Sequence, residues 1–131
     1  MTDILTPQSI FDKVCDHLMK QGKKSIYQNT DGFSCAYRGN DDTKCAVGCL
    51  IPDELYNKEM EGSTVWTLVH HGLHYEGAAP INEWIKANLA DHQELLSELQ
   101  AIHDGYEPEE WKELLQKLAK FAKVTPPASI T

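Results

Sequence analysis

The chain has 131 residues, of which 20 are acidic and 12 are basic, giving a formal net charge of −8. This length fits one domain with one hydrophobic core. The negative charge argues against direct binding of nucleic acid, because the phosphate backbone repels an acidic protein. Its apolar runs are too short to span a membrane, and the N-terminus lacks the basic and apolar regions of a secretory signal. We therefore expect a cytoplasmic protein with no nucleic-acid or membrane partner.

The first predicted helix begins at Thr6-Pro7 and ends near Gly22. Threonine is a good N-cap, proline suits the first helical position, and glycine commonly ends a helix. Between them, apolar residues recur at helical spacing from Ile10 to Met19.

Residues 33–51 predict a small β-hairpin. Residues 33–38 are rich in aromatic side chains, and residues 39–43 form a polar loop. The apolar run 45–51 fits either a second strand or a short buried helix, because its length does not decide between them. The hairpin is the favoured interpretation.

The rest of the chain is predicted to be helical. A short helix is expected between Ser63, as its N-cap, and Gly72. A longer one begins at Pro80, breaks near Asp91 and ends at Gly105, and a last one begins at Pro108. We expect a mainly α-helical α+β domain over residues 1–124, with four to five helices, and a flexible tail over residues 125–131.

Acidic residues concentrate in residues 76–110, where nine acids accompany only one lysine. A charge run of this kind is typical of a solvated helix face, but also of a surface that docks on a basic protein. Acids on consecutive turns repel each other by about 0.2–0.5 kcal/mol per close pair, which motivates the docking hypothesis. The candidate binding residues are Glu83, Asp91, Glu94, Glu98, Asp104 and Glu107.

The cysteines and histidines offer two alternatives. A zinc site of three cysteines and one histidine is possible by residue type. Its candidate ligands are Cys35, Cys45, Cys49, His70, His71 and His74. The irregular cysteine spacing instead favours reduced, buried thiols that bind no metal and form no disulfide, and no cofactor is expected. A Cys-His enzyme, with Cys35 or Cys45 as nucleophile, is the third possibility, although no known catalytic motif is present.

Two strings, Cys35 to Gly39 and Lys44 to Glu54, followed by Tyr56 and residues 60–62, carry a resemblance. Together with the first helix and the segment 103–111, they resemble a family of small uncharacterised proteins of bacteriophages and bacteria. This resemblance covers the chain up to about Val124. It implies a phage-type accessory protein that inhibits or modulates a protein of the bacterial host.

Arg38, the only arginine of the chain, lies within the first string, beside Tyr37. An arginine in an apolar, cysteine-rich setting favours a bidentate pair with a carboxylate, and the candidates are Asp53, Glu54 and Glu61. The alternative is that Tyr37 and Arg38 bind a ligand anion.

The sequence as a whole favours a non-enzymatic acidic binding protein that engages a basic protein surface through its acidic helices. The alternative is a small metal- or ligand-binding regulator that uses the cysteine-rich hairpin and the nearby histidines.

Overall fold

The computed structural model describes residues 4–29 and 32–131. Within these residues the chain forms five α-helices and one antiparallel pair of strands, which confirms the predicted mainly helical α+β class. The elements are α1 (Pro7–Gln21), β1 (Ile26–Asn29), β2 (Gly32–Cys35), α2 (Val65–His70), α3 (Ala79–Asn88), α4 (Gln93–Gly105) and α5 (Pro108–Ala122). None of the described helices is both long enough and apolar enough to cross a membrane.

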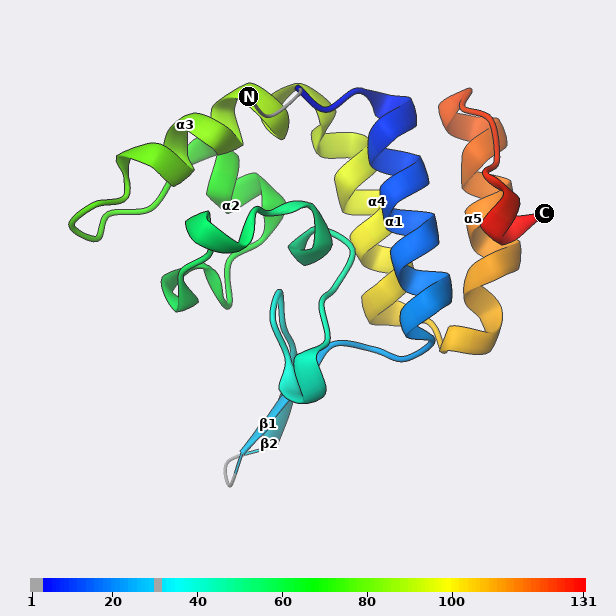
Figure 1. Cartoon of the computed structure of the whole chain (residues 1–131), viewed down its shortest axis with the longest axis horizontal. Helices are drawn as coiled ribbons and strands as arrows, with labels where there is room; N and C mark the ends of the chain where they lie inside the picture. Colours follow the sequence, from blue (N-terminus) through cyan, green and yellow to red (C-terminus); the bar gives the residue numbers. More distant parts are fainter. Residues whose placement is uncertain (1–3, 30–31) are drawn as a thin grey trace.

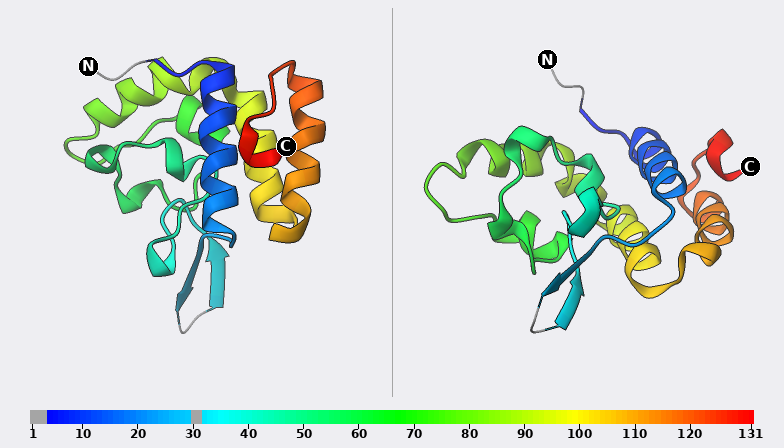
Figure 2. Two further views of the ribbon diagram at one scale, coloured as in Figure 1. Left: turned by 45° about the vertical axis from the view of Figure 1, so that its right-hand side comes forward. Right: turned by 60° about the horizontal axis from the view of Figure 1, so that its bottom comes forward.

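Helices α1, α4 and α5 lie side by side, with α1 and α4 running in one direction and α5 in the other (Figure 1). Their shared interior includes the fully buried side chains of Phe11, Leu99 and Trp111. The shorter helices α2 and α3 lie on the other side of α4, and the strands extend from one end of the molecule (Figure 2).

The ends of α1 and α5 follow the sequence signals. Thr6 caps α1 by accepting a hydrogen bond from the Ser9 backbone N–H, and Gly22 closes the helix at φ 64°. Pro108 occupies the first turn of α5. Local capping therefore fixes two of the three bundle helices.

The strand pairing differs from the expected hairpin at 33–51. Strand β2 pairs with β1 on its N-terminal side, with Ile26 opposite Cys35. The apolar run 45–51 is not a strand but contains a 3₁₀ turn, Gly48–Leu50. A Cβ on Gly48 would lie 2.1 Å from the Tyr37 carbonyl oxygen, so this run packs as a compact turn directly on the chain after β2. A single antiparallel bridge between Arg38 and Lys44 is the only β pairing within 36–51.

The long helix breaks where the sequence indicates. Helix α3 ends at Asn88, a 3₁₀ turn spans Ala90–His92, and α4 begins at Gln93. The cap differs from the expectation, because His92 is the N-cap of α4 and makes no side-chain capping bond. At α2 the capping side chain is Thr64 rather than Ser63.

The last residues of the chain pack against the bundle, which differs from the expected flexible tail. The Gln8 side-chain amide exchanges two hydrogen bonds, each of 2.8 Å, with the backbone of Thr125. Ser129 donates to the Asp16 carboxylate over 2.6 Å, and the Ile130 side chain is fully buried. The C-terminal segment thus completes the core between α1 and α5.

Candidate functional site

Three of the six candidate acids line one groove between α4 and α5. Two hollows, of about 280 and 400 Å³, share Glu94, Glu98, Leu118 and Phe121 in their walls. Asp91 lines the first hollow. We call the surface formed by Asp91, Glu94, Glu98, Leu114, Leu118 and Phe121 the acidic groove. Lys117, which pairs with Glu113 over 3.5 Å, also lines the second hollow.

The acidic groove combines exposed carboxylates with exposed apolar surface. Asp91, Glu94 and Glu98 are all exposed, and none forms an ion pair with any residue that the structure describes. Phe121 is 74% exposed, an unusually high fraction for a large aromatic side chain. Carboxylates without an ion-pair partner and an exposed aromatic side chain therefore lie on the same side of the bundle.

Helical spacing explains how α5 presents this surface. Leu114, Leu118 and Phe121 follow each other at intervals of four and three residues, so they lie on one face of the helix. Trp111 and Leu115 are fully buried and lie on the neighbouring face of α5, which faces the core. Phe121 is not among the candidate binding residues predicted from the sequence, although its spacing from Leu118 on α5 was a signal for it.

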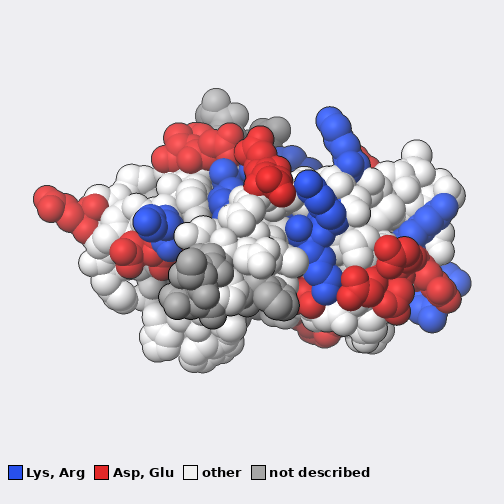
Figure 3. All heavy atoms as spheres, turned by 90° about the horizontal axis from the view of Figure 1, so that it is seen from below, with Lys and Arg blue, Asp and Glu red and all other residues white. Residues whose placement is uncertain are grey.

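The other three candidate acids lie elsewhere. Glu83 is an exposed residue of α3. The Glu107 carboxylate caps α5 by accepting a hydrogen bond from the backbone N–H of Glu110, and the Glu110 carboxylate accepts one from the backbone N–H of Glu107. Asp104 accepts hydrogen bonds from Gln100 and His103 at a different cavity. On the face seen in Figure 3, acidic and basic side chains occur side by side, and neither sign covers the surface. The charged segment 76–110 is thus divided between several surfaces.

Arg38 links the two sequence strings that carry the resemblance, residues 35–39 and 44–54. Its Nη1 donates to Asp53 Oδ1 over 2.8 Å and its Nη2 donates to the Ile51 carbonyl over 2.8 Å, while the guanidinium stacks 4.8 Å from the centre of the Tyr56 ring. Asp53 was one of the three carboxylates expected for it, but the contact uses one carboxylate oxygen rather than two. The Arg38 side chain is only 19% exposed, so most of it is taken up by these internal contacts.

Glu61 provides a second anchor for the same strings. Its carboxylate accepts from the backbone N–H groups of Tyr37 (2.9 Å) and Arg38 (3.1 Å) and from the Tyr56 hydroxyl (2.6 Å). The Tyr37 hydroxyl in turn donates to the Ser63 carbonyl. The Tyr37 hydroxyl and the two Arg38 Nη groups therefore make contacts inside the protein, whereas the buried Arg38 Nε has no hydrogen-bond partner among the described residues.

The cysteine and histidine side chains that were expected as zinc ligands do not lie together in one site among the described residues. His70, His71 and His74 are exposed on and just after α2, where Trp66 stacks on His70 with 4.4 Å between ring centres. Among the described residues, the group of three potential ligand side chains that lies close together is Cys35, His103 and Asp104, with ligand atoms within 4.8 Å of one another. His103 was not a candidate ligand in the sequence analysis.

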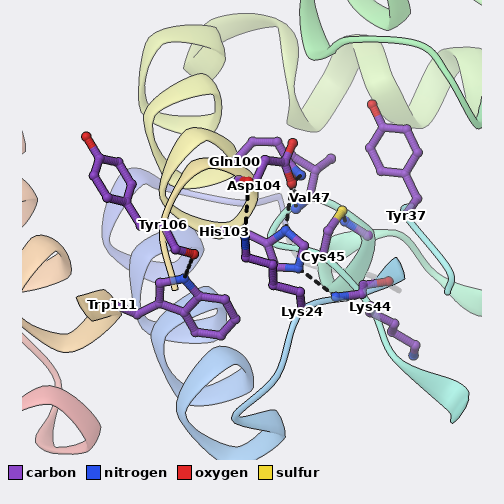
Figure 4. Close-up of polar contacts among 12 residues, drawn as sticks. Lys24, Tyr37, Lys44, Cys45, Val47, Gln100, His103, Asp104, Tyr106 and Trp111 are labelled. Carbon is purple, nitrogen blue, oxygen red and sulfur yellow. Dashed lines mark hydrogen bonds and ion pairs between the residues drawn. The ribbon is translucent and has the colours of Figure 1, made fainter. Parts of the chain in front are cut away.

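His103 is already fully used by the protein (Figure 4). Its Nε2 accepts from the Ser25 backbone N–H at 2.9 Å, and its Nδ1 lies 2.6 Å from Asp104 Oδ1. An Nε2 that accepts carries no proton, so Nδ1 carries the ring proton and donates it to Asp104. Neither nitrogen is left to bind a metal or to take a proton from Cys35.

The cysteine thiols are held in their protonated form. Burial raises the pKa of Cys45 to about 12, and burial also raises the pKa of Cys35, where the nearby Asp104 carboxylate adds to the rise. A thiolate is the form that attacks an electrophile or binds a metal. Both thiols line the cavity of about 420 Å³ beside α4, but its environment does not activate them.

Comparison of the chain with protein-family models, with curated proteins and with solved structures gives no match in any of the three.

Proposed function

We propose that the protein is a non-enzymatic binding module whose acidic groove docks a basic, amphipathic segment of a partner protein. The observation that carries the proposal is the juxtaposition of the unpaired Glu94 and Glu98 carboxylates with the 74% exposed Phe121 ring. A partner segment with an apolar side chain flanked by lysine or arginine complements both features.

The arrangement of the acids favours a partner that carries cationic side chains. Glu94 and Glu98 are one turn apart on α4, so they repel each other by about 0.2–0.5 kcal/mol in the free protein. Cationic side chains from a partner would relieve this repulsion. The exposed Phe121 would contribute by losing its contact with water, which is the larger source of affinity at such surfaces.

The resemblance to phage proteins adds the proposal that the partner is a protein of the bacterial host, which the module inhibits or modulates inside the cytoplasm. Charge complementarity also predicts a characteristic kinetic behaviour. Association should slow as salt screens the carboxylates, while dissociation changes less.

The test uses a photoreactive benzoylphenylalanine placed at Phe121, with the same group at Trp66 as the control. Trp66 is an exposed aromatic residue on α2, outside the acidic groove. We expect irradiation in host lysate to cross-link one basic protein at position 121 and not at position 66. The purified partner is then titrated against wild type, Glu94→Lys/Glu98→Lys and the matched charge control Glu59→Lys/Glu76→Lys.

The groove variant should lose binding, whereas the matched control should keep it, because Glu59 and Glu76 are exposed acids that do not line the groove. Asp104 is left unchanged, because its carboxylate supports His103. Equal loss in the two double variants would show that only net charge matters. Undiminished binding by the groove variant would show that the partner contacts another surface. Either result overturns the proposal.

A further inference from the structure

The two hollows of the acidic groove follow each other along α4. Because α5 runs opposite to α4, the end of α5 lies beside the start of α4 (Figure 1). Asp91, just before α4, lines only the hollow of about 280 Å³, and Tyr106, just after α4, lines only the hollow of about 400 Å³. We call them the Asp91 hollow and the Tyr106 hollow.

The Asp91 hollow has acidic side chains in its wall and, among the described residues, no lysine or arginine. Its carboxylates belong to Asp91, Glu94 and Glu98, and all three residues are exposed. The wall also contains His92, whose Nε2 donates to the Leu5 carbonyl over 3.3 Å. Carboxylates attract a lysine or arginine side chain and repel an acidic one, so this end of the groove favours a cation.

The Tyr106 hollow has a more apolar wall that includes one basic residue. The residues that line this hollow and not the other are Ala101, Ile102, Tyr106, Leu114 and Lys117. Tyr106 is 45% exposed, so its ring offers apolar surface to a partner. The Lys117 side chain is 70% exposed, and its pair with the 76% exposed Glu113 is therefore weak, which leaves the ammonium charge acting on the hollow. This end favours an apolar side chain without positive charge.

The difference between the two ends comes from Asp91 and Lys117. Glu94 and Glu98 line both hollows, so they attract a cation to the groove without deciding its position. Asp91 adds negative charge at one end, and Lys117 adds positive charge at the other. On α4, Leu95 lines only the first hollow and Ala101 only the second, six positions later, which corresponds to about 9 Å along the helix. An extended peptide covers that length in about three residues.

From this asymmetry we infer that the acidic groove binds its partner segment in one orientation, with a lysine or arginine side chain in the Asp91 hollow and an apolar side chain in the Tyr106 hollow. The inference rests on the proposed function and adds the order of the two side chains along the groove. A partner with the opposite order would place its cation beside Lys117 and its apolar side chain among the carboxylates.

The test uses the flexible peptide Arg-Arg-Gly-Gly-Leu-Leu with uncharged ends as a probe. A nitroxide is attached through an amide bond to the arginine end in one version and to the leucine end in the other. Paramagnetic broadening of the protein's amide NMR signals then locates each end. We expect the arginine-end label to broaden Asp91 and His92 more than Tyr106 and Lys117, and the leucine-end label to do the reverse. The expected preference is about fivefold, the effect of two exposed charge interactions.

Lys117→Glu should bring this preference close to one, because a glutamate at this position attracts a cation to the Tyr106 hollow as well. The matched control is Lys120→Glu, which makes the same charge change at an exposed position of α5 that lines neither hollow. This control should keep the wild-type preference.

Three results would overturn the inference. Saturable binding in the groove with equal broadening at both ends, or with the reverse order, would contradict the orientation and leave the proposed function standing. An equal loss of preference in Lys117→Glu and Lys120→Glu would assign the orientation to net charge rather than to the wall of the Tyr106 hollow. Absence of saturable binding, or binding that Glu94→Lys/Glu98→Lys does not weaken, would count against the proposed function together with the inference.

Discussion

The backbone N–H of Ser25 donates a hydrogen bond to Nε2 of His103, a residue 78 positions later in the chain. The bond joins the chain before β1 to the last turn of α4. The imidazole is fully buried and stacks on Trp111, with 5.5 Å between ring centres. This histidine is therefore a tether between the strands and the bundle.

Replacing His103 by phenylalanine should destabilise the fold although the ring and most of the volume are kept. The substitution leaves the Ser25 N–H without an acceptor and removes the donor that Asp104 faces. An unpaired buried polar group costs about 1–3 kcal/mol, so we expect a loss of that size in the free energy of unfolding from urea titration. The control is His70→Phe at an exposed position, which should change stability by less than about 0.5 kcal/mol. Equal stability of the two variants would contradict the tether.

Arg38→Lys should also destabilise the protein. Lysine keeps the charge but cannot reach Asp53 and the Ile51 carbonyl together or stack its charge flat on Tyr56. We expect a loss of about 1–2 kcal/mol in the free energy of unfolding, because the carbonyl loses a charged donor. Asp53→Asn should cost less, because the Asp53 side chain is exposed. A larger effect from Asp53→Asn would show that the ion pair, rather than the carbonyl contact, matters most.

Local signals predicted the helices well and the long-range contacts poorly. The ends of α1 depend on residues within a few positions, such as Thr6 and Gly22, so the sequence determined them correctly. The strand partner of β2 depended on a choice between two neighbouring segments, and apolar patterning alone does not make that choice. The turn at Gly48 is decided by its close approach to Tyr37, eleven positions away, which no local pattern reveals.

The same distinction applies to the candidate sites. The sequence suggested Asp53 as a partner of Arg38, but it did not indicate that the Ile51 carbonyl and Tyr56 share the guanidinium. His103 lies four residues after Leu99 on the buried stripe of α4, and that spacing was a signal for burial. Its acceptor role could not be inferred, because Ser25 comes from a distant part of the chain.

Stability should fall as the solution is acidified below neutral pH, because of His17. Burial lowers the pKa of His17 below its ordinary value of 6.5, and its Nε2–H donates to the Lys44 carbonyl at 2.7 Å. The unfolded chain therefore takes up a proton at His17 more readily than the fold does, so lowering the pH through about 6.5 favours unfolding.

Urea titrations between pH 7.5 and pH 5 would measure this dependence as a free energy of unfolding that declines once the pH falls below about 6.5. His17→Gln keeps an N–H donor for the Lys44 carbonyl but does not titrate, so it should flatten the curve. His74→Gln removes an exposed histidine and should retain the wild-type slope. A wild-type slope in His17→Gln would assign the dependence to other groups.

Asp53 acts in a separate range: its hydrogen bonds to Lys44 and Arg38 lower its pKa, so that contribution is lost only below its ordinary value of 3.8.

The final residues of the chain should be needed for full stability. Ile130 is completely buried, its carbonyl accepts from the Gln116 side chain, and its segment is held to α1 through Ser129 and Asp16. Ile130→Ala should lower the free energy of unfolding by about 2–4 kcal/mol, because it leaves a cavity between α1 and α5. Ile4→Ala is the matched control, since Ile4 is 68% exposed, and it should change stability by less than about 0.5 kcal/mol. Slow amide hydrogen exchange at Ile130 would support the docked segment independently, because its N–H is bonded to the Pro127 carbonyl at 3.1 Å. A flexible tail would instead give wild-type stability in Ile130→Ala together with fast exchange at this amide.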